Sequence, residues 1–193
     1  AEHIIDLSAD FRLRDADLYQ QWYGEPHAAP DWLDKFVYGL PELYRDELKT
    51  AKYVSGVGCN ATAVNLGLLP LVNTGLLETN LPIIAELKVG SSEGGASVNS
   101  GSHHPERSQT IRTYAPYGHR HTAEVIQESG LADVTLTMTS VGLVRGALAT
   151  VHGRVKDGVA LKDLWKAYRL AASQNPFLRI VKERRGIYRV PEP

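Results

Sequence analysis

The chain has 193 residues, of which 43% are hydrophobic and 22% charged, and this composition is typical of a folded protein with one or two small domains. Its formal net charge of -1 and pI of about 6.7 exclude the strong basic excess of a general nucleic-acid-binding protein. A single cysteine excludes an internal disulfide framework, no apolar run approaches the ~20 residues that span a bilayer, and the N-terminus lacks a signal-peptide pattern. We therefore expect a cytoplasmic protein with no membrane or nucleic-acid partner.

The two ends of the sequence predict a fragment of a longer chain. The first residues, "AEHIIDLS", enter almost at once a strand over residues 3–7 of a buried type, without a leading methionine. The last residues, "RGIYRVPEP", stop just after a strand-like stretch. We expect a domain upstream and at least one element downstream, and the alternative is a processed complete domain.

The first half predicts two strands and a helix around an irregular segment. Residues 8–48 are rich in aromatic residues and carry the turn-forming stretches "GEPHAAPD" and "YGLPEL". Residues 51–55 predict a short strand, and residues 61–71 predict a helix that is apolar on most faces. A buried strand follows over residues 82–89. Residues 90–108, which begin "GSSEGGASVNSG", predict a long Gly/Ser loop of a length that is usually functional or disordered.

The second half predicts helices that cover an antiparallel or mixed sheet. A helix starts with Thr122 as N-cap and ends at Gly130. The stretch "DVTLTMTSV" alternates as a half-buried strand does, and "ALATVHGRV" is expected to be its antiparallel neighbour. Residues 161–173 predict an amphipathic helix, and "FLRIV" predicts a last strand. The apolar face of that helix comprises Leu161, Leu164, Trp165, Tyr168 and Ala172.

The only cysteine, Cys59, lies where a glycine-rich turn enters the first predicted helix. A helix N-terminus stabilises a thiolate, so we expect the pKa of Cys59 to be lowered. Gly56 and Gly58 allow a tight turn and a close approach to a ligand, and the N–H groups of residues 59–61 can serve as an oxyanion hole. The alternative is a buried structural cysteine, and the spacing alone does not decide between them.

The second cluster is "YGHRHTAE" over residues 117–124. In an extended segment His119 and His121 point to one face and Arg120 to the other, and Glu124 lies one helical turn beyond His121. Histidine titrates in the range that a thiol nucleophile needs in its acid or base. The alternatives are a solvated polar loop and half of a metal site, but no third ligand has suitable spacing, so we expect no metal.

Basic residues form a third set, which is either plain surface or a means of holding phosphate or an acidic partner through bidentate contacts. Its members are Arg107, Arg112, Arg120, Arg145, Arg179, Lys182, Arg184, Arg185 and Arg189.

Six stretches, in this order, resemble the N-acetyl-γ-glutamyl-phosphate reductase family. They are "DLSADFRL" at 6–13, "YGLPEL" at 38–43, "GCNATA" at 58–63, "GHRHTAE" at 118–124, "RGALATV" at 145–151 and "NPFLRIV" at 175–181. The resemblance runs nearly end to end and includes the branch of the family whose substrate is bound to a carrier protein and which makes lysine through α-aminoadipate.

The resemblance implies an α/β protein. Residues 1–58 would be the tail of a Rossmann NADP-binding domain. Residues 59–193 would be an incomplete catalytic and dimerisation domain, α+β and like that of glyceraldehyde-3-phosphate dehydrogenase. It implies a homodimer or homotetramer.

The resemblance also implies the chemistry. Cys59 would be the nucleophile that expels phosphate from an acyl phosphate, His121 the acid/base and Glu124 its orienting residue, and NADPH would reduce the resulting thioester to an aldehyde. The implied substrate-binding residues are Asn60, Arg107, Arg112, His119, Arg120 and Arg145. The implied cofactor-binding residues are Ser8, Gly58, Gly90 and Ser92.

Three departures favour the carrier-protein branch. The nucleophile lies in Val-Gly-Cys-Asn-Ala-Thr rather than Pro-Gly-Cys-Tyr-Pro-Thr, and "KVGSSEGG" at 88–95 stands where the family has "KSGxSGAG". The segment with Arg107 and Arg112 is also unlike the acetyl-specific members. We expect a γ-aminoadipyl or glutamyl phosphate on a small acidic amino-group carrier protein, with those arginines reading the acidic end of the carrier. The alternatives are the N-acetyl-γ-glutamyl-phosphate reductase of arginine biosynthesis, a cysteine hydrolase and a non-catalytic dimerisation module.

Overall fold

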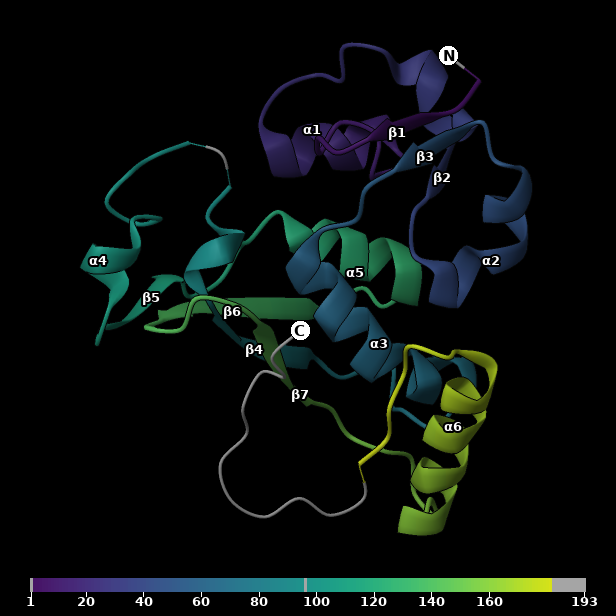
Figure 1. Cartoon of the computed structure of the whole chain (residues 1–193). Helices are drawn as coiled ribbons and strands as arrows, with labels where there is room; N and C mark the ends of the chain where they lie inside the picture. The colour runs from purple at the N-terminus through teal and green to yellow at the C-terminus, as the bar shows by residue number, and fades with distance from the viewer. Residues whose placement is uncertain (1, 96, 182–193) are drawn as a thin grey trace.

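The computed structural model describes residues 2–95 and 97–181, which form two sheets with helices between them (Figure 1). The smaller sheet holds β1 (Ile4–Asp6), β3 (Tyr53–Ser55) and β2 (Phe36–Tyr38), in that order, and both outer strands run parallel to β3. The strand at the start is thus confirmed, but its predicted burial is wrong. Ile5 is 68% exposed, because few neighbouring side chains cover this part of the sheet.

The aromatic-rich segment is regular, so the prediction of an irregular region over 8–48 is wrong. It contains α1 (Ala16–Tyr23), the 3₁₀ helix η1 (Pro30–Lys35), β2 and α2 (Pro41–Thr50). The turn residues mark where these elements begin and end. The Asp15 side chain accepts hydrogen bonds from the first turn of α1, Gly24 ends that helix with a φ of 82°, and prolines start η1 and α2.

The larger sheet has the order β5-β6-β4-β7. Its strands are β4 (Ile83–Val89), β5 (Ile111–Ala115), β6 (Val134–Val141) and β7 (Ala147–His152). β6 runs parallel to β4, whereas β5 is antiparallel to β6 and β7 is antiparallel to β4. The predicted pairing of the last two strands is therefore wrong. Both are strands, but β4 inserts between them, an order that depends on tertiary packing rather than on adjacency in the sequence.

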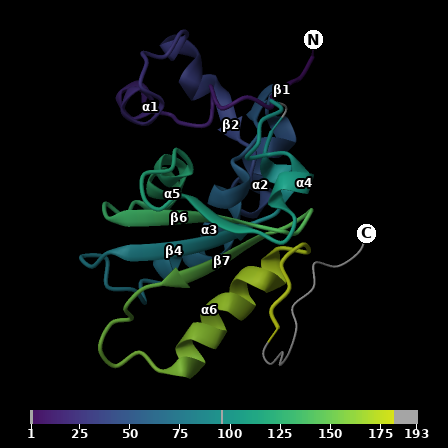
Figure 2. The same cartoon turned by 90° about the vertical axis from the view of Figure 1, so that its left-hand side faces the viewer.

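One face of the larger sheet builds the core. Its inward side chains are Ile83, Ala85, Leu87, Val89, Val134, Leu136 and Met138. They pack against α3 (Cys59–Asn73) and α5 (His121–Ser129), which lie between the two sheets (Figures 1 and 2). The alternation predicted for β6 is confirmed, because Val134, Leu136 and Met138 are all buried. This packing fixes the N-terminal ends of both helices relative to each other.

The helices begin slightly earlier than the sequence predicts. α3 starts at Cys59 rather than at residue 61, so the thiol belongs to its first residue. α5 starts at His121 with Arg120 as N-cap, so Thr122 is not the cap but a buried residue of the first turn. Gly130 ends α5 with a φ of 68°, as predicted.

The C-terminal part of the described chain is helical. α6 (Leu161–Gln174) packs on α3, and the Tyr168 hydroxyl donates to the Gly67 carbonyl at 2.6 Å. Leu161 is 69% exposed, so its predicted place on the packed face is wrong. Residues 177–181 form no strand, contrary to prediction. The basic residues from Lys182 onward lie outside the described residues.

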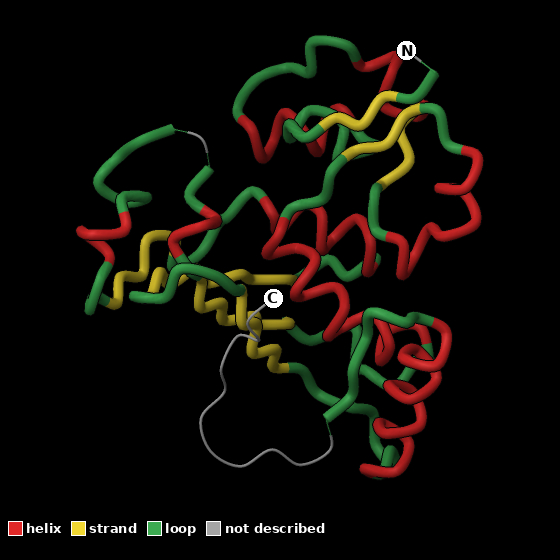
Figure 3. The backbone as a smooth tube through the Cα atoms, in the orientation of Figure 1, coloured by secondary structure: helices red, strands yellow, loops and turns green. Residues whose placement is uncertain are grey.

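The Gly/Ser segment is less irregular than predicted. Residues 90–108 include the 3₁₀ helix η2 (Ser91–Glu93) and the single-turn helix α4 (His104–Arg107), joined by loops (Figure 3). Over residues 2–95 and 97–181, the helices are all too short or too polar to cross a bilayer.

Candidate active site

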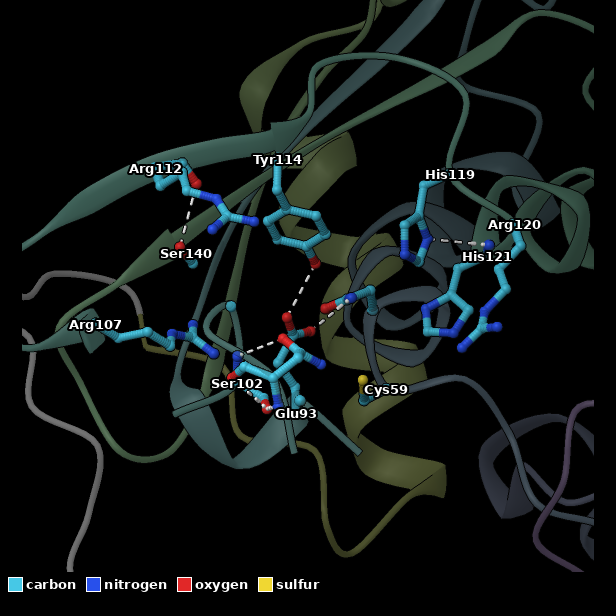
Figure 4. A pocket seen from close by; sticks show the side chains of 14 residues that line it. Cys59, Glu93, Ser102, Arg107, Arg112, Tyr114, His119, Arg120, His121 and Ser140 are labelled. Carbon is cyan, nitrogen blue, oxygen red and sulfur yellow. Dashed lines mark hydrogen bonds between the residues drawn. The ribbon is translucent and has the colours of Figure 1, made fainter. Parts of the chain in front are cut away.

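The first turns of α3 and α5 meet the 90–108 segment and β5 at a cavity of about 240 Å³ (Figure 4). Of the predicted site residues, the cavity brings together Cys59, Asn60, Arg107, Arg112, His119, Arg120 and His121. It also exposes Glu93, Gly94, Asn99, Gly101, Ser102, Tyr114 and Ser140. The nucleophile candidate, the histidine pair and three arginines thus line one cavity, although they lie up to 62 positions apart (Cys59 to His121).

Gly58 brings the cysteine turn directly against the histidine. A Cβ atom at this position would lie 2.4 Å from Glu124 Oε1 and 2.9 Å from His121 Nε2. Its φ is -68°, so glycine is needed here for close approach and not for an unusual backbone conformation. The partner in that approach is the histidine helix, whereas the sequence suggested a ligand.

Glu124 lies behind the histidine, with a side chain that is completely buried. Its Oε2 accepts hydrogen bonds from the Gly58 N–H at 2.8 Å and from the Tyr38 hydroxyl at 2.7 Å. Its Oε1 has only longer contacts, at 3.7 Å to Arg12 Nη1 and 4.0 Å to His121 Nε2. Burial raises the pKa of Glu124, and the hydrogen bonds from Gly58 and Tyr38 act against that rise.

The two histidines contact each other edge to face, with ring centroids 4.6 Å apart, and the backbone N–H of His121 donates to His119 Nδ1. Burial, together with His119, Arg12 and Arg120, lowers the pKa of His121 to about 3. Burial and Arg120 lower the pKa of His119 to about 4. Both rings are therefore neutral at pH 7, and a neutral imidazole can accept a proton from a thiol.

The thiol departs from the sequence prediction. Cys59 is exposed to the cavity, but the protein that crowds the sulfur raises its pKa, as does the carboxylate of Glu93. The backbone N–H groups of Cys59 and Asn60 act in the opposite direction, as a helix N-terminus should, but they do not prevail. The cavity is therefore lined by a thiol and a neutral imidazole rather than by a ready thiolate.

Glu93 was not singled out from the sequence, yet it lines the cavity with Cys59 and raises the pKa of its thiol. Its Oε2 accepts from Asn60 Nδ2 at 3.0 Å and its Oε1 accepts from the Tyr114 hydroxyl at 2.9 Å (Figure 4). These two bonds join the Gly/Ser segment to the first turn of α3 and to β5.

Replacement of Glu93 by glutamine is expected to shift the titration of Cys59 to lower pH. The amide keeps the shape of the side chain but removes the negative charge that disfavours the thiolate. The rate of alkylation by iodoacetamide, measured against pH, should inflect at a lower pH in this variant than in the wild type. Glu106→Gln, on the exposed face of α4, is the matched control and should titrate as the wild type does. An unshifted profile in Glu93→Gln would contradict this account.

The arginines of the cavity differ in exposure. Arg107 is only 4% exposed and donates from Nη2 to the Val89 carbonyl at 2.7 Å, so it belongs to the cavity wall. Arg112 and Arg120 are exposed at the rim, whereas Arg145 lies on an exposed loop outside the cavity lining. The prediction that Arg107 reads a partner's surface does not fit this burial.

The residues implied for the cofactor fall into two groups. Ser8 and Gly58 follow the carboxyl ends of β1 and β3. Gly90 and Ser92 follow β4, and their N–H groups donate to the carbonyls of Gly146 and Val144. An added Cβ at Gly90 would lie 2.7 Å from the Val144 carbonyl oxygen, so glycine is needed there for close backbone packing.

Arg12 and Tyr38 also reach the site, although neither was named from the sequence as a site residue. Both lie within the stretches "DLSADFRL" and "YGLPEL" that carried the family resemblance. Each reaches Glu124 from the N-terminal part of the chain. Within residues 2–95 and 97–181, no three His, Cys, Asp or Glu side chains gather as metal ligands would.

Comparison with known proteins places the chain in a family. Residues 59–192 match the family model described as the semialdehyde dehydrogenase dimerisation domain. The [LysW]-L-2-aminoadipate 6-phosphate reductase of Deinococcus radiodurans is 51% identical over 98% of this chain and 55% of its own length. The [LysW]-L-2-aminoadipate/[LysW]-L-glutamate phosphate reductase of Sulfurisphaera tokodaii is 50% identical over the same shares. The chain thus spans about 55% of the length of these curated relatives.

A solved structure shares the fold. Aspartate semialdehyde dehydrogenase from Francisella tularensis aligns with a TM-score of 0.56 at 12% identity, over 88% of this chain and 56% of its own. This likeness confirms the predicted α/β class with an α+β catalytic domain.

Fold and site together define a class of protein: an α/β chain with a cysteine at a helix N-terminus beside a histidine, an arrangement suited to covalent catalysis. The chain belongs to the semialdehyde dehydrogenase family. The predicted resemblance to the carrier-protein branch is confirmed by the names of the relatives at about 50% identity.

Proposed function

We propose that this chain forms the catalytic part of a reductase that converts a carrier-bound γ-aminoadipyl or glutamyl phosphate to the semialdehyde, in lysine and also arginine biosynthesis in the cytoplasm. The observation that carries the proposal is that Cys59 and His121 line one cavity with three arginines, and that Gly58, the residue before Cys59, packs against the His121 ring. An acyl phosphate presents an electrophilic carbonyl and a dianionic leaving group, and these are the groups that a thiol and arginines would attack and bind.

The residues of the site would act in sequence on such a substrate. His121 takes the proton of the Cys59 thiol, the sulfur attacks the acyl carbon, and the bond to the phosphate oxygen breaks, so that inorganic phosphate leaves and a thioester remains. NADPH supplies, when bound, the hydride that reduces this thioester. The N–H groups at the start of α3 stabilise the oxyanion that forms on the acyl oxygen. His121 returns the proton to the sulfur as the carbon–sulfur bond breaks and the aldehyde leaves.

The nucleotide would bind at the carboxyl edge of the smaller sheet. Ligands of doubly wound parallel sheets bind beyond the carboxyl ends of the strands, and Ser8 and Gly58 lie there. Ser8 is exposed and fits such a role. At Gly90 and Ser92 the N–H groups are already engaged, so these positions would contribute shape rather than hydrogen bonds. We infer that residues 1–58 belong to the NADP-binding domain and 59–193 to the catalytic domain.

The arginines are expected to bind different parts of the substrate. Arg107 and Arg120, in the cavity with His119 and Asn60, would bind the anionic groups of the aminoacyl phosphate. The exposed Arg112 and Arg145 would contact the acidic carrier. Aminoadipate and glutamate differ by one methylene, which is worth only ~1–3 kcal/mol to a pocket, so both carrier-bound substrates are expected to react.

A coupled assay of NADPH oxidation tests the proposal. The carrier-linked phosphates should be reduced much faster than free N-acetylglutamyl phosphate. Arg112→Gln should raise KM for the carrier-linked substrate roughly tenfold, since it loses a charge-assisted contact, and Arg169→Gln on the exposed face of α6 is the control. Faster reduction of N-acetylglutamyl phosphate would instead assign the arginine-pathway reductase. Release of acid without NADPH would indicate a hydrolase, and a complete lack of turnover a non-catalytic module.

We also propose a homodimer or homotetramer, built on the face of the larger sheet that α3 and α5 leave open. The matched family model is described as a dimerisation domain. On the open face, β4 and β7 expose Ile84 (47%) and Leu148 (57%), two large apolar side chains on neighbouring strands.

The double variant Ile84→Glu/Leu148→Glu is expected to weaken self-association, because two copies would bring like charges together at a desolvated contact. Sedimentation equilibrium should show a larger fraction of monomer than in the wild type. Leu170→Glu, which adds a charge at an exposed apolar position of α6, should associate normally. Association unchanged by the double variant would exclude this face as the interface.

A further inference from the structure

The contacts of Arg12 are not explained by substrate or cofactor binding. This residue follows β1 in the N-terminal part of the chain, and its side chain is only 12% exposed. Its Nε donates to the Gly56 carbonyl at 2.7 Å, three residues before the nucleophile. Its Nη1 lies 3.5 Å from His121 Nε2 and 3.7 Å from Glu124 Oε1. One guanidinium group thus touches the backbone that carries the cysteine, the histidine ring and the carboxylate behind it.

Glu124 alone does not hold the His121 ring in place. A distance of 4.0 Å between Glu124 Oε1 and His121 Nε2 is too long for a hydrogen bond, so the carboxylate does not hold the ring directly. Its other oxygen, Oε2, is occupied by Gly58 and Tyr38. Arg12 Nη1 is within reach of both the ring nitrogen and the oxygen left without a hydrogen bond.

The chemistry of the guanidinium decides how it acts on the ring. Arginine only donates hydrogen bonds, so the contact with Nε2 requires that nitrogen to be an acceptor. The imidazole is then neutral with its proton on Nδ1. A proton added at Nε2 would face the positive charge of Arg12, although the negative charge of Glu124 would partly compensate for it.

We propose that Arg12 is a positioning residue for the Cys59–His121 pair, which it holds at a fixed separation and keeps in its neutral thiol–imidazole form. This positioning role depends on the proposed reductase function only for the reaction that the Cys59–His121 pair then carries out. It also gives the N-terminal segment a part in the catalytic site, since Arg12 lies between β1 and α1, whereas Cys59 and His121 begin α3 and α5.

The titration of His121 provides a readout that does not depend on activity. The titratable and charged groups around His121 come from several elements. They are Arg12, Glu124 from α5, His119 and Arg120 from the residues before α5, and Cys59 from α3 in the same cavity. Tyr23 from α1 and Tyr38 from β2 lie near the carboxylate of Glu124. Of these, Arg12 is a cation that lowers the pKa of His121. Its loss in Arg12→Ala should therefore raise that pKa. Arg12→Lys should leave it closer to the wild-type value, because the charge is kept.

The experiment combines this titration with kinetics and chemical rescue. Histidine signals are followed by NMR against pH in the wild type, Arg12→Ala, Arg12→Lys and the control Arg169→Ala, with His121→Gln to assign the signal. In the reductase assay Arg12→Ala should lower kcat about 10- to 100-fold with little change in KM. Added guanidinium chloride, at concentrations that leave the wild type unaffected, should restore part of that loss in Arg12→Ala but none of the loss in Arg12→Lys.

The outcomes separate this proposal from the proposed function. An upward shift of the His121 titration together with guanidinium rescue supports the positioning role. An unshifted titration in a folded Arg12→Ala protein overturns it, and so does a loss of kcat that guanidinium does not restore. If the wild type reduces no acyl phosphate, the reductase proposal fails, and the His121 titration still decides the role of Arg12. Should Arg12→Ala fail to fold, the fall of kcat at constant KM in Arg12→Lys decides instead.

Discussion

Replacement of Cys59 by alanine is expected to abolish acyl-phosphate reduction, with a loss of kcat on the order of 10⁴-fold or more, because the sequence holds no other thiol to form the thioester. Cys59→Ser should be nearly as inactive, since a hydroxyl has a much higher pKa than a thiol and the neutral His121 is a weak base. The measurement is NADPH oxidation with carrier-linked aminoadipyl phosphate, under single-turnover and steady-state conditions.

Intact-protein mass spectrometry gives this prediction a second, independent readout. With substrate but without NADPH, the wild type should gain the mass of the acyl group and the alanine variant should not. Cys59 is exposed and the first residue of its helix, so the melting temperature of the variant should stay close to that of the wild type. Robust turnover by Cys59→Ala would show that the nucleophile is another residue. An unmodified but active wild type would argue against a stable thioester.

The residues proposed to carry the chemistry could be singled out from the sequence because they lie in short, distinctive stretches. Cys59 lies at a turn-to-helix junction, and His121 and Glu124 share one helical turn, so local rules place them without knowledge of the fold. The buried alternation of β6 follows in the same way from a period of two. Features of this kind depend on neighbours in the chain, and the structure confirms the elements on which they lie.

Other features depend on neighbours in space and could not be predicted. The insertion of β4 between β6 and β7 is a property of the assembled sheet. The pKa of Cys59 is raised by burial and then by the carboxylate of Glu93, which belongs to a segment that the sequence predicts as a loop. Arg12 and Tyr38 lie in the stretches that carried the family resemblance. Only the folded structure shows that both side chains reach Glu124.

Gly58 is the position where these spatial constraints are tightest, and Gly58→Ala is expected to cost both stability and activity. The added methyl group would lie 2.4 Å from Glu124 Oε1 and within 2.9 Å of the His121 ring, in a region where neither side chain has free space. Relief requires the first turns of α3 and α5 to move apart, which should lower the free energy of unfolding by about 1–3 kcal/mol. A shift of His121 by about 1 Å can reduce kcat about 100-fold.

Gly67→Ala provides the matched control on the same helix. There the added methyl group would meet only Val151 Cγ2, at 4.0 Å, so the substitution should stabilise the helix by up to ~1 kcal/mol and leave turnover unchanged. Urea denaturation and steady-state kinetics of both variants measure the contrast. Because the φ of Gly58 suits any residue, a loss confined to Gly58→Ala identifies the contact with His121 and Glu124 as its cause. Normal turnover in Gly58→Ala would mean that the cysteine and histidine need not be held this closely for reaction.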